Sequence, residues 1–268
     1  MPASLDLYRR WGHRTVRQGW VEPPTLGRTL DVLRALSRAQ ASLGVEGGVA
    51  EIGVHRGRLF VGLQLLEPDR TAVAIDVFGD QHLNLDGSGF GDLRRFESNV
   101  RRWADWSRVV VEQADSTLMS GADVRRLAGG PIRLFSVDGG HTAETVLTDL
   151  RTAEAALADG GIVIVDDVFN EAWPGVAVGM SRYLGTDGAL VPFAIGFNKT
   201  YLTDPARASV YRAALCRRFE RRTRIALKTA QFHGHDVEVL TSLPVTPRVM
   251  LRRNRTLRRA YRALRPSR

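Results

Sequence analysis

Short apolar runs alternate five times with helical segments, and this alternation constrains the fold more than any other feature of the sequence. The runs are rich in β-branched residues and do not alternate with polar ones, which is typical of strands buried on both faces of a parallel sheet. These runs lie at Val49–Val54, Thr71–Ile75, Val109–Val111, Ile132–Val137 and Ile162–Val165. The helical segments between them lie at Arg58–Leu66, Asp92–Trp103, Ala122–Leu127 and Ala143–Ala158. The pattern predicts right-handed βαβ units in a doubly wound α/β sheet.

Segments of different character flank this unit. Residues 1–44 carry leucines at helical intervals and predict N-terminal helices, with a break at Pro23–Pro24 and a new helix from about Thr25. We take this helical segment as the candidate interface of a homo-oligomer. Residues 45–205 form the α/β domain. It is completed by a helix near Val176–Leu184 and strand-like runs near Val191–Phe197 and Thr200–Thr203.

The positive charge of the chain is concentrated at its C-terminal end. Residues 206–268 contain 17 Lys and Arg against 3 Asp and Glu, whereas residues 1–205 contain 21 against 26. We therefore predict a basic C-terminal extension, ending in the stretch LRRNRTLRRAYRALRPSR at 251–268. Three interpretations compete. A solvated or packed segment is favoured, contact with an anionic membrane surface comes second, and nucleic acid is not expected because no aromatic-and-basic binding motif accompanies the stretch.

Composition excludes several classes of protein. The single cysteine, Cys216, excludes an intramolecular disulfide and a cysteine-based zinc cluster. No segment approaches the roughly 18 consecutive apolar residues of a membrane span. The first residues contain no apolar core of the signal-peptide type, so we expect a cytoplasmic protein.

Acidic residues lie at or near the carboxyl end of each of the five predicted strands. Sheets of this kind bind their ligands at the carboxyl ends of the strands. An edge with so much negative charge needs cations or hydrogen-bond donors to offset it, which favours a functional site over a purely structural role. The acids are Glu51, Asp76, Asp115, Asp138 and the pair Asp166–Asp167, in strand order.

The loop after the first strand contains Gly53 and Gly57, which let a ligand approach the backbone closely. A dinucleotide-binding fingerprint needs glycine where His55 and Arg58 stand, and no phosphate-binding GK[ST] loop is present. A nicotinamide or flavin dinucleotide is therefore disfavoured. Taken alone, these glycines are more often part of a tight strand-to-helix turn.

The next two strand ends suit a nucleoside. Asp76 is placed to accept hydrogen bonds from ribose hydroxyls, and Asp115 with Ser116 is placed to bracket an adenine. Asp76 alone could also cap a turn. The joint placement on consecutive strand ends favours a nucleoside without a pyrophosphate, and S-adenosylmethionine is the leading candidate.

Five motifs together resemble the class I S-adenosylmethionine-dependent methyltransferases. The closer resemblance is to the metal-dependent sugar O-methyltransferases of macrolide and aminocoumarin biosynthesis, and it covers about residues 45–204. It implies a Rossmann-like, seven-stranded sheet with the last strand antiparallel. It also implies that Glu51 and Asp76 help to hold the cofactor. The motifs are EIGVHRG, the second-strand Asp76, QADS, SVDGGH and VDDV.

The fourth and fifth strand ends suit a metal ion. The carboxylates of Asp138, Asp166 and Asp167 would repel one another unless a cation lies between them. Oxygen ligands favour Mg²⁺ over zinc, and a coordinated hydroxyl loses its proton more readily. We therefore predict these three aspartates as metal ligands. The alternative for the Asp166–Asp167 pair is an acidic turn that caps the following helix.

His141 is the candidate general base. It lies three residues after Asp138, near the start of a predicted helix whose dipole favours the neutral imidazole. In the family that the sequence resembles, the aspartate–x–x–histidine pattern has this role, so the resemblance implies catalytic roles for Asp138 and His141. The alternative is an ordinary helix-start residue.

These observations predict an S-adenosylmethionine-dependent, Mg²⁺-assisted O-methyltransferase. Its acceptor would be a small polyhydroxylated molecule, a sugar or a glycosylated natural product. The alternatives are a catechol-type methyltransferase, an RNA methyltransferase and a non-catalytic cofactor-binding module.

Two further features of the sequence allow two interpretations each. The polar segment 78–90 is either a lid or a surface loop, and Asn198 and Lys199 are either substrate contacts or edge-strand decoration.

Overall fold

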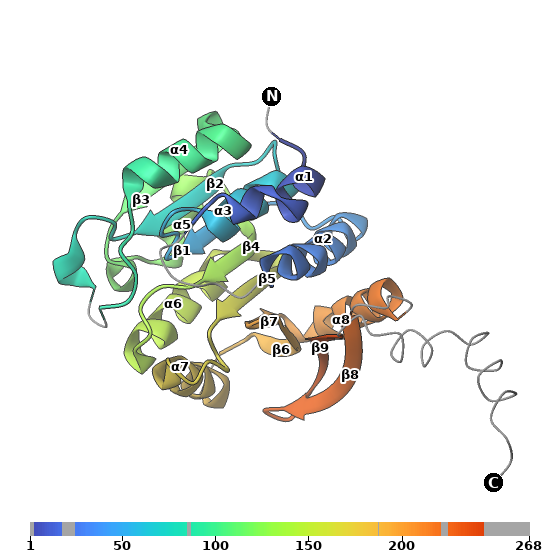
Figure 1. Ribbon diagram of the computed structural model, residues 1–268. Coiled ribbons are helices and arrows are strands. Elements are labelled where there is room, and N and C mark those ends of the chain that lie inside the picture. The colour runs from blue at the N-terminus through green and yellow to red at the C-terminus, as the bar shows by residue number, and fades with distance from the viewer. Residues whose placement is uncertain (1–2, 18–24, 85–86, 187, 221–224, 244–268) are drawn as a thin grey trace, which may run out of the picture.

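The fold is one nine-stranded mixed sheet with helices on both faces (Figure 1). In this computed structural model, residues 3–17, 25–84, 87–186, 188–220 and 225–243 are described. The strand order is β3-β2-β1-β4-β5-β7-β6-β9-β8. Strands β1 to β5 are mutually parallel, as the sequence predicts.

The elements follow the predicted alternation closely. The strands are β1 Gly48–Ile52, β2 Ala72–Asp76, β3 Val109–Gln113, β4 Ile132–Val137, β5 Leu157–Asp166, β6 Val191–Gly196, β7 Lys199–Thr203, β8 Ile225–Phe232 and β9 His235–Ser242. The α-helices are α1 Leu5–Arg10, α2 Leu26–Ser42, α3 Arg58–Leu66, α4 Leu93–Trp103, α5 Gly121–Ala128, α6 Ala143–Ala156, α7 Pro174–Gly185 and α8 Pro205–Phe219.

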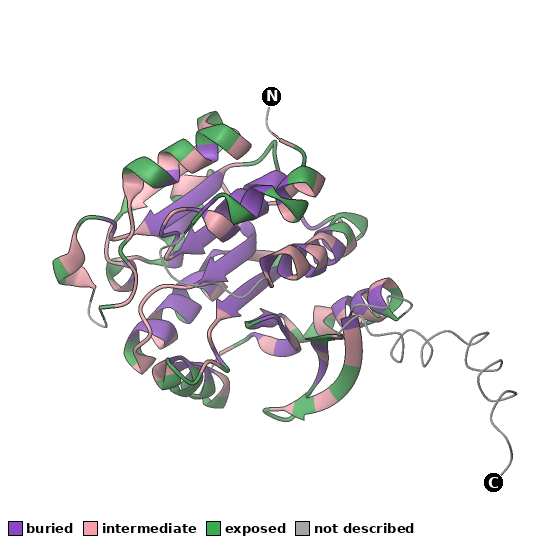
Figure 2. Ribbon diagram, in the orientation of Figure 1, coloured by how far each residue is buried: buried purple, intermediate pink, exposed green. Residues whose placement is uncertain are grey.

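Both faces of the sheet are buried, and Figure 2 shows the central strands in purple between the helices. Val49 and Ala50 are neighbours on β1, yet their side chains belong to two different hydrophobic cores. One core also contains residues of α2, α3, α4 and α8, and the other contains residues of α5, α6 and α7. This two-sided burial explains why the central strands are apolar throughout and lack polar alternation.

The prediction of seven strands is wrong, because the sheet has nine. The seventh strand, β7, is antiparallel to its neighbours β5 and β6, as expected for the last strand of the predicted seven. Strand β9 then pairs with β6, and β8 pairs with β9. A two-residue turn joins β8 to β9, and both of its residues, His233 and Gly234, have positive φ (47° and 78°), as tight hairpin turns require.

Much of the predicted basic extension is therefore ordered secondary structure. Helix α8 packs against α2 and β6, and the hairpin of β8 and β9 widens the sheet. Residues 205–220 and 225–243 thus belong to the folded domain. The basic stretch 251–268 lies outside the described residues, and so do all three interpretations of it: a solvated or packed segment, membrane contact and nucleic-acid contact.

The N-terminal helices pack on the sheet. Helix α2 begins at Leu26, directly after Thr25, where the sequence predicts its start. Its apolar side, with Leu30, Leu33 and Leu36, is fully buried in the first core. Among the described helices, none has the length and hydrophobicity that a membrane span requires.

Candidate functional site

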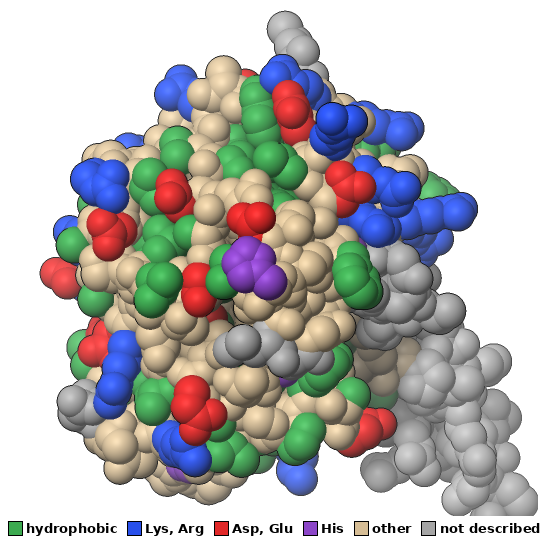
Figure 3. Space-filling view, turned by 90° about the vertical axis from the view of Figure 1, so that its left-hand side faces the viewer, with side chains coloured by type: hydrophobic (Ala, Val, Ile, Leu, Met, Phe, Trp, Pro, Cys, Tyr) green, Lys and Arg blue, Asp and Glu red, His purple; other side chains and the backbone are tan. Residues whose placement is uncertain are grey.

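A cavity of about 770 Å³ opens at the carboxyl ends of the parallel strands. It is lined by every residue that the sequence singles out for cofactor, metal or proton transfer, with the exception of Gly57. Figure 3 looks at this side of the molecule, where acidic and hydrophobic side chains are interspersed around a central histidine. The strand-end rule therefore brings residues from five separate strands to one cavity.

Gly53 is required by a close approach of two chain segments. Its φ is +81°, and a Cβ atom at this position would lie 1.7 Å from the carbonyl oxygen of Asp138. The backbone N–H of Asp138 donates to the carbonyl of Ile52 at 3.0 Å, so β1 and β4 remain paired to their ends. Gly57 has a different role, since it precedes α3 with φ +83° and a Cβ there would meet Phe96 at 2.9 Å.

Asp76 organises the part of the cavity wall at the ends of β1 and β2. Its two carboxylate oxygens accept hydrogen bonds from the backbone N–H groups of His55 at 2.7 Å and Phe78 at 2.6 Å. Burial raises the pKa of Asp76, and the two hydrogen bonds act in the opposite direction. Each oxygen keeps a further lone pair, so this carboxylate can still accept from ligand hydroxyls.

The segment after β3 forms a short turn at the same edge. Oδ1 of Asp115 accepts hydrogen bonds from the backbone N–H of Thr117 at 2.9 Å and from its hydroxyl at 2.7 Å. Ser116 is buried directly after it. These bonds fix a 3₁₀ turn, and both Asp115 and Ser116 line the cavity.

Glu51 is the most deeply buried acid of the cavity wall, with 2% of its surface exposed. The hydroxyl of Ser136 lies 3.4 Å from Oε1, while Oε2 has no hydrogen-bond partner among the described residues. Burial raises the pKa of Glu51 to about 8. A buried carboxyl group without a partner calls for a cationic or donor ligand.

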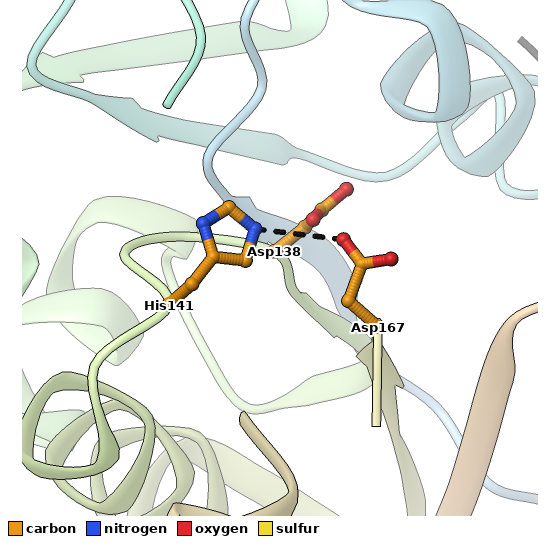
Figure 4. A group of neighbouring side chains, drawn as sticks. All are labelled: Asp138, His141 and Asp167. Carbon is orange, nitrogen blue, oxygen red and sulfur yellow. Dashed lines mark ion pairs between the residues drawn. The ribbon is translucent and has the colours of Figure 1, made fainter. Parts of the chain in front are cut away.

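Asp138, His141 and Asp167 form a group that can hold a metal ion, with one ligand atom of each within 4.8 Å of the others (Figure 4). Nε2 of His141 lies 3.5 Å from Oδ2 of Asp167. Burial and the nearby charges of Asp166 and Asp167 raise the pKa of Asp138 well above its usual range. A cation in this position would relieve that repulsion, so the donor set fits a divalent ion.

Asp167 is held in the ionised form. Burial alone would raise its pKa, but hydrogen bonds with His141, Asn170 and Asn198 outweigh burial and lower the pKa to about 2. The residue has φ +59°, which is uncommon for a residue other than glycine. Such backbone strain is often found at functional sites.

Asp166 has different surroundings from the other two aspartates. It forms an ion pair with Lys199, and its Oδ1 accepts hydrogen bonds from the side chain of Asn198 and the backbone N–H of Asp167, both at 2.9 Å. It is not part of the candidate metal group found in the described residues. Burial alone would lower the pKa of Lys199, but Asp166 and Asp138 outweigh burial and raise it.

The imidazole of His141 is held in a defined orientation. Its Nδ1 lies 2.9 Å from the hydroxyl oxygen of Ser88. Its ring stacks on the indole of Trp173, with ring centroids 4.2 Å apart and planes inclined by 17°. When Nδ1–H donates to Ser88, Nε2 on the Asp167 side is the ring nitrogen that can take up a proton, and the Asp167 carboxylate would then accept a hydrogen bond from the imidazolium.

Comparison with known protein families and solved structures shows which proteins this chain is similar to. A family described as a methyltransferase domain matches residues 50–168. This segment is similar to the methyltransferase domains of that family. The match confirms the resemblance noted in the sequence, and it includes the first five strands and the acids at their ends. A comparison with curated protein sequences finds no match.

Solved structures share the fold of the methyltransferase domain. The O-methyltransferase NovP is 19% identical, with a TM-score of 0.56, and the alignment covers 75% of this chain and 97% of NovP. A candidate caffeoyl-CoA O-methyltransferase from Staphylococcus aureus is 13% identical, with a TM-score of 0.51 and coverages of 75% and 91%. CalS11, a TDP-rhamnose 3′-O-methyltransferase of calicheamicin biosynthesis, is 22% identical, with a TM-score of 0.48 and coverages of 76% and 88%.

Three residues of the candidate site have no definite role that the sequence assigns. Ser88 lies in the polar segment 78–90, whose position after β2 was the available signal. For Lys199, the sequence allows two interpretations, a substrate contact or edge-strand decoration. Lysine is rare in this arginine-rich chain, and that rarity is a usable signal. Trp173 has no local signal, because its contact with His141 depends on how the loop before α7 folds back.

Proposed function

We propose that this protein is an S-adenosylmethionine-dependent O-methyltransferase that methylates a hydroxyl group of a sugar or glycosylated natural product with the help of Mg²⁺. The observation that carries the proposal is the continuity of one cavity. The nucleoside-type side chains of β1, β2 and β3 and the Asp138–His141–Asp167 group line the same space. A methyl donor and a hydroxyl acceptor can therefore meet within it.

The cofactor would occupy the side of the cavity formed by β1 to β3. Glu51 would face the methionine ammonium group, since a buried carboxylate with an unpartnered oxygen favours a cationic ligand. Asp76 would accept from the ribose hydroxyls, and Asp115 with Ser116 would flank the adenine. Gly53 lines the cavity and would let the ligand lie close to the backbone.

The acceptor would occupy the opposite side, next to Asp138, Asp167 and His141. A divalent cation bound by the carboxylates lowers the pKa of a coordinated hydroxyl group. Nε2 of His141 would accept the hydroxyl proton, while Ser88 and Trp173 hold the imidazole ring in place. The acceptor oxygen gains a bond to the methyl carbon, and the carbon–sulfur bond electrons return to sulfur. General-base help of this kind contributes about 10²–10⁴ in rate.

A catechol-type acceptor is the second candidate. Three aromatic side chains, Phe169, Trp173 and Phe197, line the cavity. They supply an apolar surface that the low overall aromatic content does not suggest. A vicinal aromatic diol could bind the same cation through its two oxygens.

The proposed function is tested with methyl-labelled S-adenosylmethionine and a panel of nucleotide sugars, glycosides and catechols, with EDTA or with added Mg²⁺. We expect label transfer to a hydroxyl of a glycoside, loss of transfer in EDTA, and recovery with Mg²⁺. Asp167→Asn should raise the Mg²⁺ concentration needed, whereas Asp69→Asn, at an exposed position before β2, should not. Transfer only to catechols would favour the second candidate. Transfer that is insensitive to EDTA would refute the metal-assisted mechanism.

A further inference from the structure

Lys199 supplies a fixed positive charge among the carboxylates at the strand ends. It is the first residue of β7, and its side chain is only 7% exposed. Its Nζ atom is bonded to Oδ2 of Asp166 and lies 3.8 Å from Oδ2 of Asp138. A buried cation so close to two carboxylates alters how strongly the site attracts a second cation.

Asp166 is bonded through both carboxylate oxygens. Oδ2 is paired with Lys199, and Oδ1 accepts from Asn198 and from the backbone N–H of Asp167. Asp167 differs, because its Oδ1 accepts from Asn170 and Asn198 while its Oδ2 faces His141. The two neighbouring aspartates therefore have unequal access to a metal ion.

We propose that Lys199 is a positioning residue that neutralises Asp166 and keeps it out of the metal-ligand set. Asp138 and Asp167 then provide the carboxylate ligands. This inference rests on the proposed metal site but not on methyl transfer. Asp166 and Lys199 form a neutral pair that anchors the start of β7 to the end of β5. The charge of Lys199 also weakens the attraction between the site and a divalent cation.

Substitution of Lys199 alone, and of Lys199 together with Asp166, tests whether Asp166 is neutralised by Lys199 or binds the metal ion. Lys199→Met removes the positive charge that lies beside Asp166 and Asp138, so divalent affinity should rise at least about tenfold. The double variant Lys199→Met/Asp166→Asn restores the original net charge. If Asp166 is not a ligand, the affinity of the double variant should lie within about threefold of that of the unaltered protein.

The experiment measures Mn²⁺ binding by electron paramagnetic resonance of the free ion, on full-length protein without cofactor or acceptor. Asp167→Asn is the positive control and should weaken binding at least about tenfold, since a direct anionic ligand is lost. Lys199→Arg keeps the charge and should leave the affinity nearly unchanged. Thermal melting establishes that each variant is folded. If Lys199→Met does not fold, Lys199→Gln, which keeps a donor for Asp166, replaces it.

Three outcomes would overturn the proposal. The first is a double variant that binds Mn²⁺ as weakly as Asp167→Asn, because Asp166 would then be a direct ligand. The second is a Lys199→Met or Lys199→Gln protein whose affinity is unchanged or lower. The third is that neither the unaltered protein nor the Lys199 variants bind Mn²⁺. Failure of methyl transfer in every assay would refute the proposed function but would leave these binding results interpretable.

Discussion

Glu51 should couple cofactor binding to the release of a proton. Burial raises its pKa to about 8, so Glu51 is mostly neutral at pH 7 in the protein without cofactor. An ammonium group placed beside it would favour the ionised form. Binding of S-adenosylhomocysteine, which has the same amino acid portion, should therefore release close to one proton at pH 7. Isothermal titration calorimetry in buffers of different ionisation enthalpy measures this number directly.

Glu51→Gln tests how much the negative charge of Glu51 contributes to cofactor binding. The variant loses a charge-assisted hydrogen bond of about 1.5–3 kcal/mol, so at pH 8.5 it should bind S-adenosylhomocysteine about 10–150-fold more weakly. The difference should shrink toward pH 6, where Glu51 of the empty protein is neutral. The variant should also release no proton. Equal affinity at pH 8.5, or proton release that persists in the variant, would refute this assignment.

The ionised form of Glu51 should favour cofactor binding but destabilise the folded protein when no cofactor is bound. The folded-state pKa of about 8 lies above the ordinary value of 4.5, so the stability associated with neutral Glu51 is present below pH 4.5 and is lost as pH rises through 8. The difference corresponds to at most about 5 kcal/mol. Without cofactor, Glu51→Gln should therefore melt at a higher temperature than the unaltered protein at pH 8.5, and the two should converge near pH 4.5. A lower melting temperature at pH 8.5 would contradict the reasoning.

Three further substitutions test other parts of the site. His141→Ala should lower kcat about 10²-fold, while the affinities for Mn²⁺ and S-adenosylhomocysteine, measured by calorimetry, should stay within about threefold of those of the unaltered protein. A parallel loss of Mn²⁺ affinity would mean that His141 is a metal ligand and not the base. Asp76→Ala should weaken S-adenosylhomocysteine binding by about tenfold or more, and unchanged affinity would remove this residue from the cofactor site. Gly53→Ala should destabilise the fold by at least about 2 kcal/mol in urea titrations, because its Cβ would collide with the Asp138 carbonyl. Gly44→Ala is the control, since it shares the positive φ but faces open space, and an equal loss in both would show that backbone strain alone is responsible.

The sequence by itself predicts the parallel part of the sheet and the edge at which the site lies. Runs of β-branched residues between amphipathic segments are local signals, and they locate β1 to β5. Because parallel strands end at one edge, acids that follow each strand must lie close together, and the cavity contains them all. Local chemistry was sufficient here because strand direction and handedness leave few alternatives.

The last two strands were missed because their pattern is weaker. Strand β8 has polar residues such as Lys228 among apolar ones, and β9 has mostly exposed residues at its two ends. A short amphipathic run at the edge of a sheet resembles loop sequence until its partner is known. The His233–Gly234 dipeptide between the two runs was the signal available for a tight turn.

Only the tertiary structure determines which side chains contact each of the neighbouring aspartates Asp166 and Asp167. Asp166 and Lys199 are direct register partners across β5 and β7, so two side chains 33 positions apart in the chain meet in a buried ion pair. Asp167, the next residue, turns instead toward His141. Adjacent aspartates are equivalent in a sequence, because nothing local specifies which one faces a distant lysine. Both aspartates line the cavity, but strand register pairs Asp166 with the buried Lys199 and leaves Asp167 beside His141.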